Sequence, residues 1–411
     1  MLLRLESNSM FLRPIIFLAA IFLSNLIFAQ KEDSLLYLKG EKIKTVEQWE
    51  KKRPIIKSTF LSEVYGQMPP RPNQKFTVSK ILFIDSLNLF YKEILIDLYK
   101  NSSHITQIRL SVFLPDTINK NPVILALNKC GNQTVIKNNF ITTYQDRLLH
   151  NYCSKKQEKL NGLKHSFWQL DSLFKRGYGF ATFHESDISP DIKEVKEGVF
   201  KHYPELDNKN GWGLISAWAW GLHRAIDYLH TNPLVDTNKI ILFGHSRRGK
   251  TALLATALDE RVDAVVPHQS GTLGTALVKN KPMEGLRRIN KTFPHWFSDR
   301  LKDYAKKPRS LPLDQHYLIA LVAPRPIIET VGSRDYWSSY WLSRKALLKA
   351  SPVYELYGVD GIIDKEKIKY KYQLESQKRA NLLQIRRPYG HTMNGDYWSF
   401  ILDFLDIKLR D

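Results

Sequence analysis

The chain has 411 residues, of which 43% are hydrophobic and 25% charged, and it contains only two cysteines. This length and composition exclude a disordered chain and a disulfide-dense scaffold, and they fit one large α/β domain with insertions. The formal net charge of +20 predicts a surface that attracts polyanions.

The first 29 residues have the pattern of a secretory signal peptide. Arg4 and Arg13 precede or border an apolar run over residues 14–23, and the small residue Ala29 suits a cleavage site. We expect cleavage near Ala29, a periplasmic or secreted protein, and no transmembrane segment in the mature chain. An uncleaved membrane anchor is the alternative, although the apolar run is short for a bilayer.

Residues 30–411 are expected to form a single catalytic domain. Its first part, residues 30–115, is interpreted as a polar segment that wraps on the domain and is followed by the first strands. Runs rich in β-branched and aromatic residues predict antiparallel strands over residues 76–83, 90–97 and 108–114.

From residue 123 onward, strands and helices alternate, which is typical of a parallel sheet with helices on both faces. The later strands are predicted over residues 123–127, 178–183, 239–243, 262–267, 326–331 and 382–386. The apolar segment 212–229 predicts a buried helix whose tryptophans belong to the core. The predicted fold class is therefore α/β, a three-layer sandwich with a mostly parallel central sheet and antiparallel N-terminal strands.

The heptapeptide Gly-His-Ser-Arg-Arg-Gly-Lys over residues 244–250 follows a predicted strand and precedes the helix-forming run 251–257. A strand that turns sharply into a helix through this motif exposes the serine hydroxyl beside backbone N–H groups that can hold an oxyanion. Ser246 is therefore the predicted nucleophile of an acyl transfer. The alternative is that Ser246 merely caps the helix.

An α/β-hydrolase places its acid and then its histidine after the serine in the chain. Asp335 follows the predicted strand 326–331, and His391 precedes a predicted C-terminal helix. These positions predict a triad in which Ser246 attacks, His391 acts as base and then acid, and Asp335 orients the imidazole.

The joint order of the motifs resembles the glucuronoyl esterases, carbohydrate esterase family 15, and especially their bacterial branch. The matching segments are residues 127–132, 176–183, 212–229, 244–253, 290–297, 311–316, 323–326 and 390–391. The resemblance implies an α/β-hydrolase fold without metal or cofactor. It implies cleavage of esters of glucuronic acid or its 4-O-methyl ether, as in linkages between lignin and glucuronoxylan. The expected partner is such a polysaccharide and not nucleic acid.

The resemblance also implies roles for four further residues. Arg247 matches an arginine whose guanidinium helps to hold the oxyanion. Lys250 and Glu284 match residues that bond uronate hydroxyls, and Trp337 matches a tryptophan that packs against the sugar. The alternatives are a surface arginine, a structural lysine bonded to nearby carbonyls, and ordinary rim residues.

The chain departs from the family pattern at Gln269, at Thr292 and in residues 337–340, where Trp-Ser-Ser-Tyr replaces the usual Trp-Ala-Asp-Pro. Gln269 stands where many members have a glutamate, so Asp335 must supply the carboxylate. Thr292 stands where a glutamine that contacts the sugar is expected. Substrate preference is therefore expected to differ from that for plain glucuronate methyl or benzyl esters.

Two other functions stay open at this point: an esterase of acetyl or other uronate esters, and a catalytically silent polysaccharide-binding protein. The natural alcohol and the polymer are not determined by the sequence, and a monomer is the default expectation. Nothing in the sequence places Cys130 beside Cys153, so we expect two unpaired thiols, with one disulfide as the alternative.

Overall fold

The structure is a computed structural model that describes residues 35–410 except 117, 138, 144–152, 154–159, 194–196, 280–282 and 364–379. The predicted signal peptide, residues 1–29, lies outside the described residues. No helix in the described part of the chain has both the length and the apolar composition needed to cross a membrane.

The described part of the chain divides into two compact units, with the boundary between residues 52 and 53. In the first unit, strands β1 (Tyr37–Leu38) and β2 (Glu41–Lys42) form an antiparallel hairpin. The side chain of Lys52, in the first half of helix α2 (Val46–Phe60), donates to the Leu35 carbonyl at 2.9 Å and also to the Tyr37 carbonyl at the hairpin. The second unit holds every other strand and helix named below.

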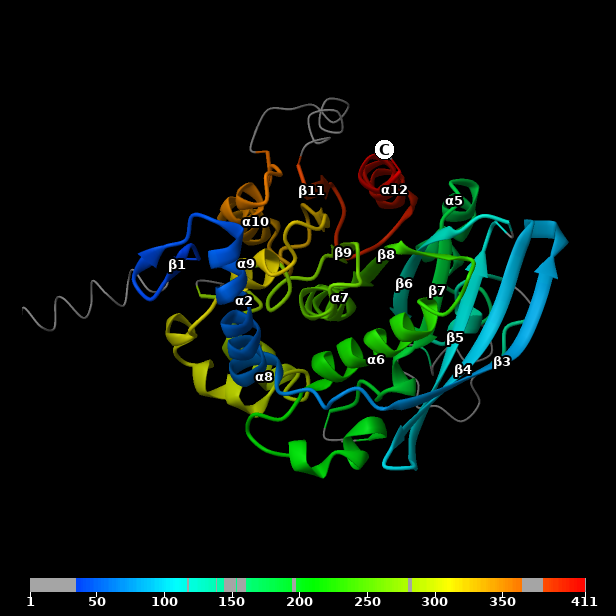
Figure 1. Cartoon of the computed structure of the whole chain (residues 1–411), viewed down its shortest axis with the longest axis horizontal. Helices are drawn as coiled ribbons and strands as arrows, with labels where there is room; N and C mark the ends of the chain where they lie inside the picture. Colours follow the sequence, from blue (N-terminus) through cyan, green and yellow to red (C-terminus); the bar gives the residue numbers. More distant parts are fainter. Residues whose placement is uncertain are drawn as a thin grey trace, which may run out of the picture. The chain divides into compact units, whose positions relative to one another are not determined.

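A single sheet of nine strands organises the second unit within the described residues, in the order β11-β10-β9-β8-β6-β7-β5-β4-β3 (Figure 1). The strands are β3 (Asn73–Ile84), β4 (Leu89–Lys100), β5 (Ser103–Leu114), β6 (Asn121–Asn128), β7 (Gly179–His184), β8 (Val235–His245), β9 (Ala264–His268), β10 (Ile327–Gly332) and β11 (Leu382–Arg387). The six strands from β6 to β11 run parallel, and β3, β4 and β5 pair antiparallel at one end. The predicted fold class is confirmed.

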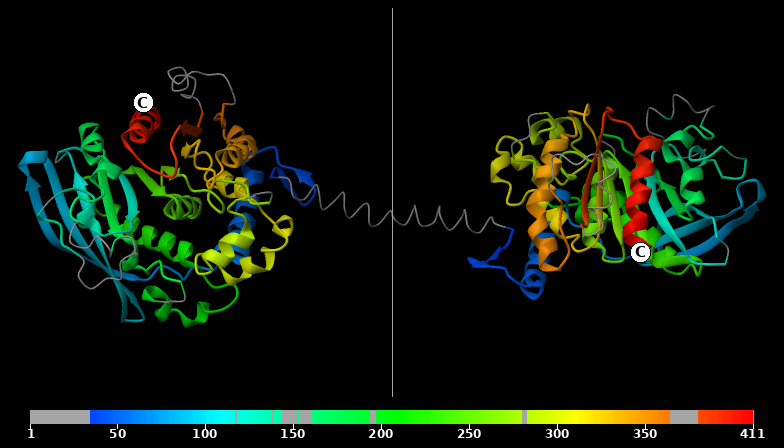
Figure 2. Two further views of the ribbon diagram at one scale, coloured as in Figure 1. Left: turned by 180° about the vertical axis from the view of Figure 1, so that it is seen from behind. Right: turned by 90° about the horizontal axis from the view of Figure 1, so that it is seen from above.

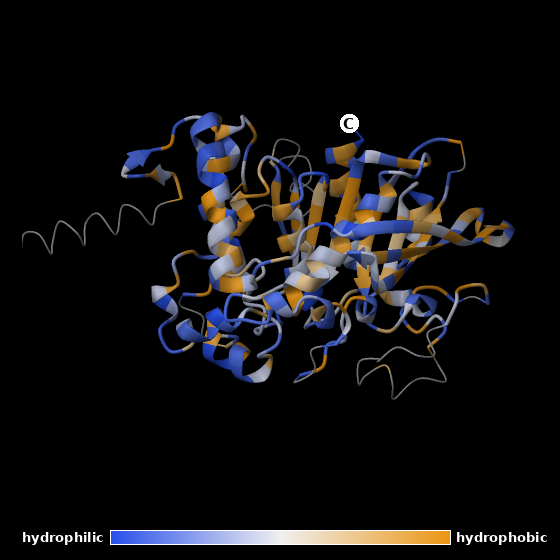
Figure 3. Ribbon diagram, turned by 60° about the horizontal axis from the view of Figure 1, so that its bottom comes forward, coloured by the Kyte–Doolittle hydropathy of each residue, from blue (hydrophilic) through white to orange (hydrophobic). Residues whose placement is uncertain are grey.

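Burial explains why the central strands are continuous apolar runs. All six residues of β7 and all six of β10 are buried, because helices cover both faces of a parallel sheet. In Figure 3 the strands in the middle of the sheet are mostly hydrophobic. Strand β3, at the edge, contains only exposed and half-buried residues.

The helices of the second unit lie on both faces of the sheet. They are α4 (His165–Trp168), α5 (Leu170–Lys175), α6 (Leu214–Leu229), α7 (Arg247–Leu258), α8 (Leu286–Thr292), α9 (Gln315–Ala320), α10 (Tyr340–Leu356) and α12 (Gly395–Leu409). Helices α6 and α7 cover one face, and α5 and α12 cover the other (Figures 1 and 2). Every residue of α6 is buried, which confirms that its tryptophans belong to the core.

The expectation of two unpaired thiols was wrong, because Cys130 and Cys153 form a disulfide. The pairing joins positions 23 residues apart in the chain and was not visible in the sequence. Cys130 lies two residues after the end of β6, and the Cys153 sulfur also contacts the Lys129 carbonyl at 3.3 Å. The fold therefore closes a loop at the carboxyl end of a central strand.

Candidate active site

Ser246 lies at the sharp turn between β8 and α7. Its φ of 60° and ψ of −126° are seldom adopted by a residue with a side chain, and its hydroxyl makes no capping bond to the helix. Both glycines of the motif are required by close packing. A Cβ at Gly244 would lie 2.1 Å from the Arg248 carbonyl oxygen, and one at Gly249 would lie 2.8 Å from that of Gly244. The strained turn therefore presents the serine at the carboxyl edge of the sheet.

Asp335 and His391 reach each other from two neighbouring parallel strands. Asp335 follows β10 and His391 follows β11, and Nδ1 of His391 lies 2.6 Å from Oδ2 of Asp335. The other oxygen, Oδ1, accepts the Ser338 backbone N–H at 3.2 Å. Burial raises the pKa of Asp335, but the hydrogen bond and charge of His391 and the bonds from Ser338 outweigh it and leave the pKa below its ordinary value. Asp335 is therefore an ionised partner for the imidazole.

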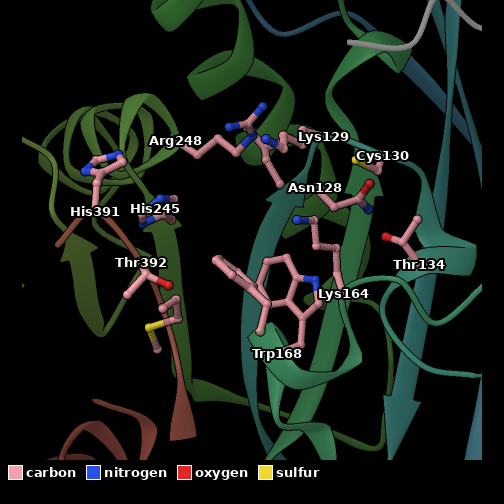
Figure 4. A pocket seen from close by; sticks show the side chains of 13 residues that line it. Asn128, Lys129, Cys130, Thr134, Lys164, Trp168, His245, Arg248, His391 and Thr392 are labelled. Atoms are coloured by element: carbon pink, nitrogen blue, oxygen red, sulfur yellow. The ribbon is translucent and has the colours of Figure 1, made fainter. Parts of the chain in front are cut away.

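His391 also lies beside the serine turn. The ring of His391 is 4.6 Å from that of His245, the residue before Ser246, and the two rings are seen together in Figure 4. Among the described residues, no hydrogen bond joins the Ser246 hydroxyl to His391. Such bonds are often long in an enzyme without substrate and tighten when substrate binds.

Gln269, where the family resemblance led us to expect a glutamate, supports the His391 loop. It is 1% exposed, and its Nε2 donates to the Gly390 carbonyl at 2.7 Å. A glutamate in the same conformation would place a carboxylate oxygen against that carbonyl oxygen, so the neutral amide suits this site.

Arg247 is the first residue of α7, where backbone N–H groups have no partner within the helix. Its Nη1 donates to Oδ2 of Asp191, and its guanidinium lies 4.2 Å from the centre of the Trp296 ring. Asp191 also contacts His295 Nε2 and accepts from Trp296 Nε1, each at 2.9 Å. Although burial raises the pKa of Asp191, the His295 hydrogen bond and the Arg247 charge hold it well below its ordinary value. The guanidinium is therefore fixed by a buried anion and an aromatic plane.

Asp191 did not emerge from sequence reasoning. It lies in an irregular segment after β7, far from the serine motif in the chain, and no spacing rule connects it to Arg247. The only available signal was an acidic residue in a loop at the carboxyl side of a predicted central strand.

Lys250 and Glu284 form a buried pair with side-chain exposures of 2% and 4%. The Lys250 ammonium donates to the carbonyls of Ser270 and Thr272 and to Glu284 Oε1, at 3.3 Å for the carboxylate. Glu284 Oε2 accepts the Thr272 backbone N–H at 2.8 Å. These are the contacts of the structural lysine that the sequence left as an alternative.

Trp337 lies two residues after Asp335 and is half-buried. The Arg288 guanidinium lies 4.6 Å from the centre of its ring. Thr292 is exposed at the end of α8. Trp337 thus offers an aromatic surface near the Asp335–His391 pair. The side chain of Thr292 is too short to reach as far as the glutamine expected at that position.

A mostly parallel sheet, a serine in a strained strand-to-helix turn, and an aspartate–histidine pair later in the chain define an α/β-hydrolase. The comparisons with known proteins identify the family within this class. A family profile described as "Glucuronyl esterase, fungi" matches residues 166–358.

The chain is 31% identical over 392 residues to carbohydrate esterase MZ0003 from an unknown prokaryotic organism, a match that covers 91% of this chain and 88% of that protein. It is 30% identical over 192 residues to the 4-O-methyl-glucuronoyl methylesterase of Phanerochaete carnosa, over 44% of this chain and 47% of the fungal protein.

Two solved structures are also similar. A promiscuous CE15 esterase from a marine bacterial metagenome has 30% identity and a TM-score of 0.81, over 92% of this chain and 96% of its own. The glucuronoyl esterase from Solibacter usitatus has 27% identity and a TM-score of 0.78, over 92% and 97%. The chain belongs to the glucuronoyl esterases of carbohydrate esterase family 15, and it is a carboxylic ester hydrolase.

Proposed function

We propose that this protein is an exported serine esterase that hydrolyses esters of glucuronic acid or 4-O-methyl-glucuronic acid, as in linkages between lignin and glucuronoxylan. The observation that carries the proposal is the 2.6 Å contact between His391 and a buried, ionised Asp335, next to a strained serine turn, in a chain of this family.

In the proposed reaction, the Ser246 hydroxyl attacks the C6 carbonyl of the uronate ester while His391 takes its proton. The tetrahedral intermediate then expels the alcohol, which receives that proton from His391. Water, activated by His391, hydrolyses the acyl-enzyme and regenerates the serine. Asp335 holds the imidazole tautomer and stabilises its cationic form.

Negative charge develops on the former carbonyl oxygen during the attack. We assign its stabilisation to the backbone N–H and the guanidinium of Arg247, because both belong to the residue after the nucleophile. Asp191 is the positioning residue for that guanidinium. A positive charge fixed before the reaction needs no reorganisation as the oxyanion forms.

The uronate is proposed to lie on the side of Trp337, Glu284 and Lys250. Trp337 is assigned the direct contact, because half-buried aromatic faces pack well on sugar rings. Since three hydrogen bonds within the protein already engage the Lys250 ammonium, we assign Lys250 and Glu284 a binding role through the loop that they hold.

Three esters separate this proposal from its alternatives. Benzyl glucuronate, methyl galacturonate and 4-nitrophenyl acetate should be compared by kcat/KM, with benzyl glucuronate expected to be the best substrate. Ser246→Ala should abolish hydrolysis while it retains uronate binding, and the exposed Ser172→Ala is the matched control. Preference for the acetyl ester would favour the general esterase. Binding of glucuronoxylan without hydrolysis by the unaltered protein would favour the silent polysaccharide-binding protein.

Export has its own test. Expression of the full chain in a bacterial host, followed by N-terminal sequencing of the protein from periplasm and medium, should give a chain that begins at Gln30. A protein that keeps its first 29 residues and stays with the membrane fraction would favour the anchor instead.

A further inference from the structure

A cavity of about 330 Å³ opens beside His391. Figure 4 looks into it and shows His391 and His245 on one wall, with Lys129 and Arg248 between them and the wall that carries Lys164. Trp337 and Glu284, which belong to the proposed uronate side, are not among its lining residues, whereas His245 and Arg248, which flank the nucleophile in the chain, are. The cavity therefore lies on the His391 side of the nucleophile.

The cavity is cationic. Lys129, Lys164 and Arg248 line it, and none of the described residues on its lining is an aspartate or a glutamate. Arg248 pairs with Glu185, which is 1% exposed. Burial, followed by the charges of Arg248 and Lys164, lowers the pKa of Lys129 to about 8. The three positive charges thus act on one another at short range.

Several contacts hold the backbone that carries Lys129. Its carbonyl contacts His184 Nε2 at 3.1 Å and the sulfur of Cys153 at 3.3 Å, and the next residue, Cys130, is bridged to Cys153. The disulfide therefore fixes one basic wall of the cavity before any ligand arrives, which lowers the entropic cost of binding.

The opposite part of the lining is aromatic and apolar. Phe167 and Trp168 come from α4, with ring centres 4.9 Å apart, and Phe167 contacts the His245 ring edge-on at 5.6 Å. Basic groups above an apolar aromatic surface suit a ligand with a flat or apolar body and an anionic substituent.

The direction of the reaction identifies which part of the substrate the cavity would hold. In acyl transfer to serine, the histidine gives its proton to the leaving oxygen, so the leaving alcohol lies on the histidine side. We propose that this cavity binds the leaving alcohol and selects alcohols that carry a carboxylate. The inference rests on the proposed function, because it assigns the alcohol side of the same ester.

Three esters of glucuronic acid that differ only at one position test the inference: benzyl, 4-carboxybenzyl and 4-carbamoylbenzyl. The carboxylate and the carboxamide have nearly the same shape and differ in charge. We expect kcat/KM for the carboxybenzyl ester to exceed that for the carbamoylbenzyl ester by about five- to tenfold at low salt, the range that one or two partly exposed charge pairs supply. The ratio should fall towards one in high salt.

Variants connect the effect to the cavity. Lys129→Gln and Lys164→Gln should each lower the carboxybenzyl-to-carbamoylbenzyl ratio several-fold, whereas Lys120→Gln, an exposed lysine outside the cavity, should leave it unchanged. Because both rates are measured on one preparation, the ratio does not depend on the folded fraction. The carboxylate of the natural alcohol could belong to an acidic sugar or to an aromatic acid. A glucuronate ester formed with a hydroxyl of a galacturonic acid glycoside, compared with the 4-carboxybenzyl ester, distinguishes these two sources.

The outcomes separate this inference from the proposed function. Hydrolysis of the benzyl ester with a ratio near one, or a ratio that survives both lysine substitutions, would overturn the cationic alcohol pocket and leave the esterase assignment intact. Failure to hydrolyse any of the three glucuronate esters would overturn the proposed function itself.

Discussion

Asp335→Asn tests the proposed triad most sharply, because the structure dictates which way the new amide must face. The Ser338 N–H requires an acceptor at the Oδ1 position, so the asparagine oxygen stays there and its NH₂ group faces His391. An NH₂ donor cannot accept a proton from Nδ1. The imidazole must then accept at Nδ1 and carry its proton on Nε2, the nitrogen that has to act as base towards Ser246.

The expected loss is large. The corresponding change in a serine protease costs about 10⁴-fold in kcat through the same wrong tautomer. At 1.36 kcal/mol per tenfold, this equals about 5 kcal/mol of transition-state stabilisation. Asp335 is 4% exposed, so water cannot readily replace the lost carboxylate. Folding should be affected much less, because the substitution keeps the side chain's shape and the Ser338 hydrogen bond.

The assay is steady-state hydrolysis of benzyl glucuronate, with unfolding in urea measured in parallel. The matched control is Asp396→Asn. Asp396 lies five residues after His391, and its carboxylate pairs with Arg387 at 2.6 Å. The control should keep kcat within about threefold of the unaltered protein. A folded Asp335→Asn protein that retains a tenth or more of the original kcat would refute the reasoning and require another carboxylate behind His391.

Arg247→Ala should lower kcat by about 10²- to 10³-fold with a smaller change in KM, and a lysine at this position (Arg247→Lys) should restore little of the lost kcat. A change confined to KM would contradict the oxyanion role. Asp191→Asn should reproduce most of that kcat loss, and an unaltered kcat would show that Arg247 needs no anchor. Lys250→Met leaves a buried carboxylate without its cation and should cost about 3–5 kcal/mol of unfolding free energy in urea, so an unchanged midpoint would count against the pair. Replacing Cys130 and Cys153 by serine should cost about 3 kcal/mol in the same assay, as expected for a closed loop of this length, and a loss below about 1 kcal/mol would contradict a stabilising bridge.

Local patterns were sufficient for the architecture. Each predicted strand core overlaps an observed strand, because a parallel sheet buried on both faces demands runs such as residues 239–243 and 326–331. The serine turn was equally visible, since Gly244 and Gly249 occupy positions where a Cβ would collide with backbone. These constraints act between residues that are neighbours in the chain, so composition and spacing express them directly.

The sequence by itself therefore determined the fold class, the serine turn and the order of serine, aspartate and histidine. Only the tertiary structure decided which distant groups meet: the disulfide between Cys130 and Cys153, the anchoring of Arg247 by Asp191, and the burial of Lys250 against Glu284. It also decided that Lys129 and Lys164 share a cavity with His391. The physical reason is that these contacts depend on how loops after different strands converge at one edge of the sheet, and no periodicity in the chain records that convergence.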